Sequence, residues 1–461
     1  MRLMADPVIG QAVRRFRVIT LHGAPMIIAT SLLLLSFAGF FWAWIGYPLH
    51  LRSRRKRWSL TTLARDHKPS VSIIITAFNQ ESVILRKLSN TLALDYPRDL
   101  VEVLVVSDGS TDRTEERVSR LKDPRVRLVP LPRTGRLVAL QQGALRAHGE
   151  VLVFTDTNVS IERSALGTLM RNFADPNVGG ATAAVKVRRR RNGDAMAVGE
   201  SVFSRYDDWV RGLESALGSV HAADRAMYAI RRTLMCAPRN LAQSDDMAFS
   251  TNIVLSGKRL VYEPQAHCRR DVPGDGAREL RRRVHVTNYT LRSIAEIKWR
   301  LLRRPGYALQ LLSHTVARSL SPLFLATMLA CSALLAPVHP AFVWVLGAQA
   351  LAYSLALLGW KLRNTRIARF PLFALPAWFA SFNVAACLGL IAFFTGRRPS
   401  GASPRKYATG GRAPVVDARP SPEKRVAPAF ADPVSQAVAS DAGRGPSYVL
   451  LDPAPPINAI I

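Results

Sequence analysis

Hydrophobic residues follow two different patterns along this chain. Between about residues 70 and 255, short apolar runs alternate with segments in which apolar residues recur every three or four positions. Elsewhere the chain has long apolar blocks without a charged side chain, at 26–48, 320–338, 341–360 and 371–395. The first pattern predicts buried strands that alternate with amphipathic helices, and the second predicts helices that span a membrane.

The alternating region predicts one α/β domain within residues 70–275. Strands are predicted at 71–77, 101–107 and 151–156. Helices are predicted at 81–94, 112–122, 136–147, 161–172 and 200–218, with Ser110 or Thr111 and Ser160 as N-caps. The aromatic stripe of the last helix favours a core position over a platform for an acceptor. Strands that alternate with helices are typical of βαβ units, so we expect a mostly parallel, Rossmann-like sheet.

The block at 26–48 is predicted to be a transmembrane helix that follows an N-terminal segment, 1–25. A helix of this length crosses the ~30 Å hydrocarbon core of a bilayer. A cleaved signal peptide is the alternative, because arginines at 14–17 precede the block. The block is longer than the ~7–15 residues of a signal core and runs directly into basic residues at 52–57. These features favour a membrane anchor whose basic flank lies in the cytoplasm.

The C-terminal part of the chain is predicted to contain basic interfacial helices at 276–318 and about three membrane segments within 320–395. Positive charges gather at 361–369, whereas 337–340 has none. The positive-inside rule therefore places 361–369 in the cytoplasm and 337–340 outside. Three spans would then place the basic tail, 397–461, outside, against the same rule, so a re-entrant segment is an alternative for one block. The tail is rich in Pro, Gly, Ala, Ser and Arg and is predicted to be disordered.

Composition narrows the classes of partner. The formal net charge is +30 and the sequence pI is near 11.1, which would suit a nucleic-acid binder. The Arg and Lys clusters flank the apolar blocks, however, and this position is better explained by anionic lipid at the cytoplasmic surface. Four cysteines without CxxC or His-interleaved spacing indicate neither a zinc site nor a disulfide framework.

Two of the predicted strands end on acidic side chains. The run at 151–156 stops on Asp156, with Asn158 two positions later, and the run at 101–107 is followed by Asp108. One such acidic tip is typical of an ordinary turn. In an open α/β sheet, however, ligands lie beyond the carboxyl ends of the strands, so several polar tips together indicate a metal or phosphate site.

Adjacent carboxylates at Asp245 and Asp246 begin a further predicted helix. Acidic residues at a helix start complement the helix dipole by about 0.3–1 kcal/mol, and this is the purely structural explanation. A chemical role is the alternative. Like-charge repulsion is then expected to raise the pKa of a carboxylate beside Asp245 and to make it a better base.

Five segments in this order resemble the motifs of family 2 inverting glycosyltransferases: Val71 to Asn79, Ser107 to Thr114, Gly135-Arg136, Phe154 to Asn158, and Ser244 to Asp246. The resemblance covers about residues 70–300. The flanking apolar blocks resemble the membrane-embedded branch that includes cellulose and hyaluronan synthases. The resemblance implies a GT-A fold, a nucleotide-sugar donor that is usually a UDP-sugar, and a divalent cation, Mg²⁺ or Mn²⁺.

The same resemblance suggests a role for each site residue. Asp108 corresponds to the acid that binds the uracil or ribose, and Arg136 stands where a Lys commonly contacts the nucleotide. Asp156 and Asn158 occupy the positions of the DxD motif, with Asp156 on both nucleotide-sugar and metal. The resemblance also implies that Asp246 is the general base and that Asp245, in the Glu place of the TED motif, contacts the nucleotide-sugar. Arg281 and Arg283 are expected to hold its pyrophosphate.

The chain departs from the family pattern at four positions. Gln80 stands where the first motif often has Glu, and Asn158 replaces the second DxD acid, so that one negative metal ligand is lost. Leu280 and Val284 replace the Gln and Trp of the QxxRW motif. The absent Trp puts processive transfer in doubt.

These observations predict a multi-pass glycosyltransferase of the inner (plasma) membrane with its catalytic domain in the cytoplasm. It is expected to transfer a sugar from a UDP-sugar to a lipid or glycan acceptor with inversion. A catalytically inactive membrane scaffold or nucleotide sensor is the alternative, because of the departures at Gln80, Asn158 and Val284. Nucleic-acid binding is disfavoured, because the sequence contains no recognisable binding module.

Overall fold

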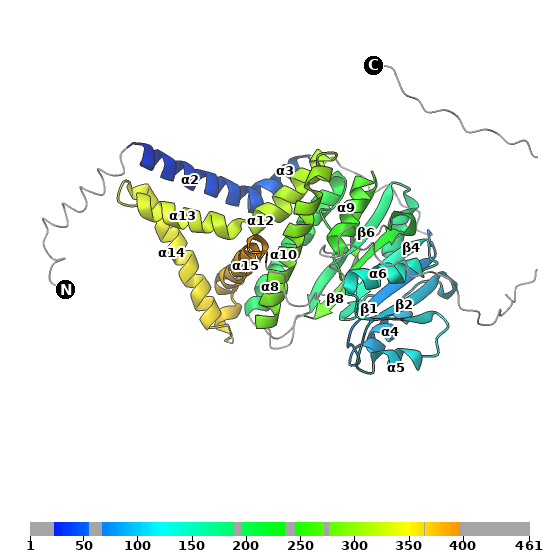
Figure 1. The fold of residues 1–461 in the computed structure, drawn as a ribbon. Helices are drawn as coiled ribbons and strands as arrows, with labels where there is room; N and C mark the ends of the chain where they lie inside the picture. Colours follow the sequence, from blue (N-terminus) through cyan, green and yellow to red (C-terminus); the bar gives the residue numbers. More distant parts are fainter. Residues whose placement is uncertain are drawn as a thin grey trace, which may run out of the picture. The chain divides into compact units, whose positions relative to one another are not determined.

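The computed structural model describes residues 23–54, 67–188, 195–235, 245–271, 276–363 and 365–396. These ranges leave out most of the predicted N-terminal segment, the basic residues at 55–57, Ser244 and the predicted disordered tail. Figure 1 shows a sheet domain at one end of the described part and long helices at the other.

The domain is built on one mixed sheet of eight strands in the order β3-β2-β1-β4-β7-β6-β8-β5. Its first half is parallel, with β1 between β2 and β4. Antiparallel β7 follows β4, and β6 pairs antiparallel with β7 and parallel with β8. The strands are β1 (Val71–Ala77), β2 (Val101–Asp108), β3 (Val126–Leu131), β4 (Val151–Asp156), β5 (Val159–Ile161), β6 (Val178–Arg188), β7 (Met227–Arg231) and β8 (Arg259–Asp271).

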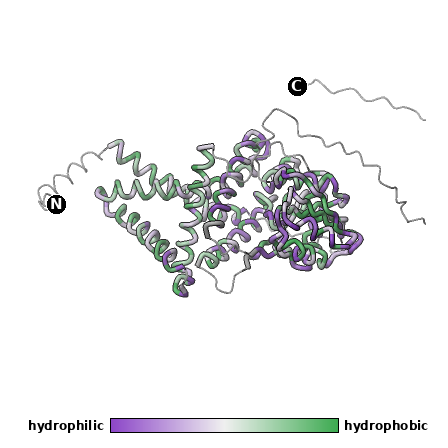
Figure 2. Tube along the Cα trace, turned by 60° about the horizontal axis from the view of Figure 1, so that its bottom comes forward, coloured by the Kyte–Doolittle hydropathy of each residue, from purple (hydrophilic) through white to green (hydrophobic). Residues whose placement is uncertain are grey.

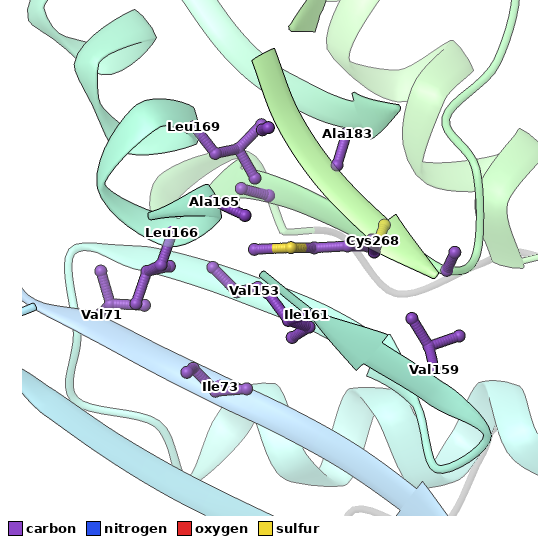
Figure 3. Packing of buried hydrophobic residues seen from close by; sticks show 14 of the residues in the cluster. Val71, Ile73, Val153, Val159, Ile161, Ala165, Leu166, Leu169, Ala183 and Cys268 are labelled. Carbon is purple, nitrogen blue, oxygen red and sulfur yellow. The ribbon is translucent and has the colours of Figure 1, made fainter. Parts of the chain in front are cut away.

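Helices cover both faces of this sheet, since alternate residues of a strand point to opposite sides. Ile73 and Ile75 of β1 join one core cluster, together with residues of α4, α5 and α7, whereas Ile74 joins the cluster on the other face with α6, α9 and α10. Figure 3 shows Ile73 and Val153 packed beneath Leu166 and Leu169 of α7. The helices are α4 (Ile84–Leu92), α5 (Thr114–Ser119), α6 (Arg136–Leu145), α7 (Ala165–Met170), α8 (Ala195–Leu217), α9 (Asp245–Leu255) and α10 (Gly276–Leu301).

The predicted strands match the structure closely and α6 begins at Arg136 as predicted, but the predicted N-caps were wrong. Helix α5 begins at Thr114, and the side chain of Asp112, rather than Ser110 or Thr111, accepts a hydrogen bond from the Thr114 backbone N–H at 3.0 Å. Ser160 lies in β5 and not at a helix start. The prediction placed the caps directly after the strands and did not allow for the loops that carry the polar strand tips.

Within the described residues, three helices are long and apolar enough to cross a membrane: Ala24–Arg54 (α2, η1 and α3), α14 (Pro340–Lys361) and α15 (Pro371–Phe394). Two consecutive helical segments, Pro305–Ser319 and Ser321–Leu335 (α13), are together long and apolar enough to span as well, and their axes are bent by 56° relative to each other. Figure 2 shows that hydrophobic residues predominate along α2, α13 and α14. The predicted block at 320–338 therefore corresponds to one arm of the bent pair.

Helices α2 and α13 run side by side in opposite directions (Figure 1). The indole Nε1 of Trp44, near the end of the first span, donates to Ser321 Oγ at 2.8 Å, and Ser321 begins α13. At the other end of the pair, Leu335 packs in one cluster with Ala29 and Leu33. Helix α13 thus runs the length of α2 away from the sheet domain.

Helix α15 packs against the domain instead. Its residue Gly389 lies so close to α10 that an added Cβ would stand 2.7 Å from Thr287 Cβ. Near its start, an added Cβ on Gly199 of α8 would clash with Trp378. Phe203 of α8 packs against the same Trp378 ring, with 4.6 Å between centroids. Tyr206 of α8 packs instead on Tyr47 and Leu51 of the first span, whereas Trp209 and Leu217 are exposed. The aromatic stripe of α8 is thus only in part a core surface, and its Phe203 packs on α15.

Candidate active site

The two acidic strand tips meet at one edge of the sheet. Strand β1 pairs in register with β4 on one side, Thr76 opposite Asp156, and with β2 on the other, Ala77 opposite Ser107. Because all three strands are parallel, Asp108 and Asp156 end at the same carboxyl edge. The prediction that several strand ends face one polar crevice is consistent with this topology.

Asp156 belongs to a cluster of charged side chains from four elements, of which Asp245 is buried and the others are partly exposed. Arg136, at the start of α6, lies with its Nη1 2.5 Å from Asp156 Oδ1 and its Nε 3.1 Å from Asp245 Oδ2. Arg225, in the segment before β7, donates through Nε to Asp245 Oδ1 at 2.9 Å and also through Nη2. The structure therefore brings together Arg136, Asp156 and Asp245, which the sequence assigned to the nucleotide-sugar.

Asp245 is fixed in its charged form. Burial alone would raise the pKa of Asp245, but the guanidinium groups of Arg225 and Arg136 hold that pKa well below its usual value. Burial likewise opposes the charge on Arg136, whereas Asp156 and Asp245 raise its pKa overall. The negative charge of Asp245 is thus neutralised by two cations. The like-charge repulsion that the sequence predicted from Asp245 on a neighbouring base is therefore not supported.

Asp246 differs from Asp245 in exposure. Its side chain is 22% exposed, compared with 2% for Asp245. Its Oδ1 accepts a hydrogen bond from the Met247 backbone N–H at 3.0 Å and lies 4.0 Å from Arg225 Nε. Of these two carboxylates, Asp246 is the one that an incoming molecule can reach more readily.

Asp108 is held by the loop that leads into α6. Its Oδ1 accepts backbone hydrogen bonds from Thr134 at 2.7 Å and Gly135 at 2.9 Å, and its carboxylate also pairs with Arg133. Gly135 has φ +94°, a conformation that L side chains rarely adopt. Asp108 therefore organises the turn that presents Arg136, whether or not it also contacts a nucleotide.

Three buried polar atoms in this region lack a hydrogen bond from any residue that the structure describes: Asp156 Oδ1, Arg136 Nη2 and Tyr228 Oη. The contact of Asp156 Oδ1 with Arg136 is close enough for an ion pair but has poor hydrogen-bond geometry. Buried polar groups are rarely left without partners, so their concentration at one place indicates a ligand site. Asp156 offers carboxylate oxygen and the exposed Asn158 offers amide oxygen, which are donors that Mg²⁺ and Mn²⁺ accept.

The two arginines predicted to hold pyrophosphate lie on α10 and are not drawn into this cluster. Arg281 is exposed, and Arg283 donates to Glu279 at 2.9 Å and to Glu200 of α8. The guanidinium carbon of Arg283 also lies 5.4 Å from the centroid of the Trp378 ring. These contacts tie α10 to α8 and α15, so a role on pyrophosphate stays a prediction.

Sequence reasoning missed Arg225 and Tyr228. Neither residue belongs to a segment that carried the resemblance. Their part in the site depends on β7, which returns antiparallel beside β4 and places Tyr228 opposite Phe154. The only signal available in the sequence was an apolar run at 226–230 preceded by Asp224-Arg225.

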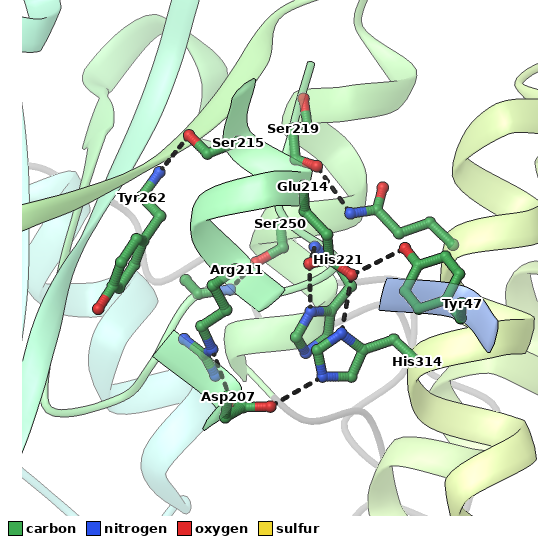
Figure 4. A network of polar contacts seen from close by, with 12 residues as sticks. Tyr47, Asp207, Arg211, Glu214, Ser215, Ser219, His221, Ser250, Tyr262 and His314 are labelled. Carbon is green, nitrogen blue, oxygen red and sulfur yellow. Dashed lines mark hydrogen bonds and ion pairs between the residues drawn. The ribbon is translucent and has the colours of Figure 1, made fainter. Parts of the chain in front are cut away.

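A second buried polar cluster joins the domain to the membrane helices (Figure 4). The ligand atoms of Glu214, His221 and His314 all lie within 4.8 Å of one another, as they would around a metal ion. Each of these atoms already has a partner, because Glu214 accepts from Tyr47 Oη at 2.9 Å and contacts the Nδ1 atoms of both histidines. The Nε2 of His314 lies 2.8 Å from the cationic Arg318. These contacts favour a hydrogen-bonded joint over a metal centre.

Comparison with known proteins identifies the domain. A family model described as glycosyl transferase family 2 matches residues 72–233. The chain contains a family 2 glycosyltransferase domain. This family 2 domain includes Asp108, Arg136, Asp156 and Arg225, and the prediction of the family is confirmed.

Two curated relatives share this domain. The chain is 23% identical over 248 residues to poly-beta-1,6-N-acetyl-D-glucosamine synthase of Staphylococcus aureus, which covers 51% of this chain and 59% of the synthase. It is 28% identical over 160 residues to beta-monoglucosyldiacylglycerol synthase of Nostoc, with 33% of each protein covered. The chain thus matches less than two thirds of the length of these relatives.

A solved structure extends the likeness beyond the family 2 domain. A mannosyltransferase from Pyrobaculum calidifontis, determined in complex with GDP-Man and Mn²⁺, superposes with a TM-score of 0.61 at 23% identity. The match covers 80% of this chain and 99% of the mannosyltransferase. The predicted α/β GT-A-like fold with additional apolar helices is therefore confirmed, although its sheet is mixed beyond β4.

Proposed function

We propose that this protein is a membrane glycosyltransferase that transfers a sugar from a UDP-sugar, with inversion, to a lipid or glycan acceptor. The observation that supports this most directly is the group of buried polar atoms without hydrogen bonds, Asp156 Oδ1, Arg136 Nη2 and Tyr228 Oη. A nucleoside diphosphate and its cation offer the complementary charges and hydrogen bonds. The names of the two curated relatives, one a polysaccharide synthase and the other a glycolipid synthase, support a glycan or a lipid as acceptor.

Asp246 acts as the general base. It accepts the proton of the acceptor hydroxyl while the hydroxyl oxygen forms a bond to the anomeric carbon of the donor. The bond from that carbon to the diphosphate breaks, and its electron pair leaves with UDP. Asp245 is unsuited to this role, because two arginines neutralise it and only 2% of its side chain is exposed.

Arg136 and Arg225 place positive charge beside the leaving group. Both remain charged, because neighbouring carboxylates raise the pKa of each guanidinium despite burial. Fixed cations that face developing negative charge lower a barrier without reorganising during the reaction. A divalent cation held by Asp156 and Asn158 would add Lewis-acid stabilisation of the diphosphate, and the Mn²⁺ of the similar mannosyltransferase is consistent with that assignment.

The apolar helices hold this chemistry at a membrane surface. Helix α10, with Lys298, Arg300, Arg303 and Arg304 at and beyond its end, is suited to the anionic inner leaflet. A lipid acceptor, or a glycan passed between the membrane helices, would approach from this side. The basic connection between α14 and α15 favours a cytoplasmic catalytic domain.

The test is UDP release by purified full-length protein. UDP-sugars are offered one at a time with membrane lipid extract and with Mg²⁺ or Mn²⁺, and products are examined by mass spectrometry. We expect metal-dependent UDP release and a glycosylated lipid or polymer with one donor. UDP binding without release from any donor would instead favour the inactive nucleotide-sensor alternative, and no binding of any nucleotide-sugar would overturn both.

A further inference from the structure

Lys87 is a buried lysine beneath the loop that carries Asp156 and Asn158. It lies on α4 and is only 2% exposed, although it belongs to a helix whose other charged residue, Arg86, is exposed. Burying an amine that water would otherwise solvate is costly, so its position calls for specific partners. Burial also lowers the pKa of Lys87 to about 7, although Cys268 and Asp156 act in the opposite direction.

The partners of Lys87 stand on both sides of the acidic tip. Its Nζ donates to Thr155 Oγ1 at 2.9 Å, one residue before Asp156, and to the Val159 carbonyl oxygen at 2.8 Å, one residue after Asn158. Either protonation state of the amine supplies the two N–H donors that these bonds need. The amine therefore closes the loop from 155 to 159 from below.

One of these bonds extends to the segment that carries Arg225. The hydroxyl of Thr155, which accepts from Lys87, donates in turn to the Ala226 carbonyl oxygen at 2.7 Å. Ala226 follows Arg225, the residue that pairs with Asp245. A second clamp from the same helix reinforces the loop, because Asn90 Nδ2 donates to the Ile161 carbonyl oxygen at 2.9 Å and Asn90 Oδ1 accepts from the Ile161 N–H at 2.8 Å.

We propose that Lys87 is a positioning residue that holds the Asp156 to Asn158 loop and the Arg225 segment in the arrangement that receives the cation and diphosphate of the donor. It acts through Thr155, Val159 and Ala226 and does not touch the donor. This inference rests on the proposed function for its ligand, but the position of the loop is a property of the protein alone.

The test compares Lys87→Met with Arg86→Met in the full-length protein. Both variants replace a basic side chain of α4 by Met, and only the first removes the two internal hydrogen bonds. Hydrogen exchange is followed at residues 155–161, and UDP affinity is measured by calorimetry with and without Mn²⁺. Removing a residue that supports a metal ligand without touching the metal typically lowers metal affinity by about 10–100-fold.

We expect Lys87→Met to speed exchange at 155–161 and to weaken UDP binding in Mn²⁺ by about 10–100-fold, with a much smaller effect on UDP binding without the cation. Arg86→Met should match the wild type in both measurements. Lys87→Met leaves the buried Val159 carbonyl without its donor, so some loss of thermal stability is expected with either role and does not discriminate between them. A purely structural role predicts lower stability with unchanged Mn²⁺-dependent UDP affinity, and that result would overturn the proposal.

If Lys87→Met does not fold, Thr155→Val removes the hydroxyl bonds to Lys87 and Ala226 with little change of shape and carries the same expectations. If the wild type binds no UDP under any condition, the proposed function fails. The exchange measurement still decides the positioning role, because unchanged protection at 155–161 in the variant contradicts it without reference to a ligand.

Discussion

Arg136 and Asp245 are 109 positions apart in the sequence, yet the Nε of Arg136 donates to Asp245 Oδ2 at 3.1 Å. This contact joins the N-terminal end of α6, on the parallel half of the sheet, to the start of α9. It also separates the roles of the two adjacent carboxylates, because Asp245 is engaged by arginines while Asp246 remains partly exposed.

Asp245→Asn is therefore expected to destabilise the protein. The substitution removes the buried carboxylate that Arg136 and Arg225 share, and breaking a buried pair costs up to about 3–5 kcal/mol. The midpoint of thermal unfolding in detergent should fall clearly below that of the wild type. An unchanged midpoint would mean that the arginines find other partners and that Asp245 is not the centre of this cluster.

Asp246→Asn should have the opposite profile. The side chain is partly exposed and the amide can still accept the hydrogen bond from the Met247 N–H, so the unfolding midpoint should stay near that of the wild type. Loss of a general base typically lowers the rate by about 10²–10⁴-fold, while binding of a donor that the base does not touch is retained. Turnover per folded molecule and UDP affinity are the measurements. Near wild-type turnover would exclude Asp246 as the base.

The neutral Asn158 predicts a dependence of metal binding on nucleotide. With Asp156 as the one acidic ligand of the pair, and with Arg136 beside it, Mn²⁺ should bind poorly until a diphosphate supplies further negative oxygen. Asn158→Asp should tighten Mn²⁺ binding in the absence of nucleotide. Titration calorimetry of both proteins without UDP tests this. Tight binding of Mn²⁺ by the nucleotide-free wild type would contradict it.

The sequence predicts the site residues that local patterns reveal and misses those that distant parts of the chain bring into place. Alternating apolar residues determine the strands, and the polar residues that end those strands, Asp108 and Asp156, are visible as local features. Arg225 and Tyr228 are not, because their position depends on the antiparallel return of β7 beside β4. Lys87 is misleading for a different reason: on an amphipathic helix a lysine is normally solvated, and only the loop folded above it explains its burial.

The membrane arrangement gives a prediction about the end of α15. A count of three C-terminal spans places that end opposite the catalytic domain. The end nevertheless lies on α10, where Arg292 Nη2 donates to the Ala392 carbonyl oxygen at 3.4 Å and its guanidinium carbon lies 5.8 Å from the Phe393 ring centroid. We therefore expect Thr395 to lie on the side of the catalytic domain.

Single cysteines in a cysteine-free background test this topology with a membrane-impermeant thiol reagent on intact cells. His339→Cys, at the far end of α13, should be labelled from outside. Arg366→Cys and Thr395→Cys should be labelled only after the membrane is opened. Labelling of Thr395→Cys in intact cells would restore α15 as a full span.

The joint between Tyr47, Glu214, His221 and His314 predicts how stability depends on pH. Burial and the nearby His314 lower the pKa of His221 to about 4, although Glu214 acts in the opposite direction. In the unfolded chain the same group titrates near 6.5. Between these values the unfolded state binds more protons than the folded state, so the free energy of unfolding should fall as pH is lowered from 6.5 to 4, by about 3 kcal/mol for this group alone.

His221→Gln cannot titrate and should flatten this part of the profile while lowering stability at neutral pH, where the wild-type contacts with Glu214 are intact. Unfolding midpoints measured at half-unit steps of pH for the two proteins provide the test, with Arg86→Met as a control that should follow the wild-type curve. Parallel profiles for wild type and His221→Gln would show that the acid sensitivity arises elsewhere.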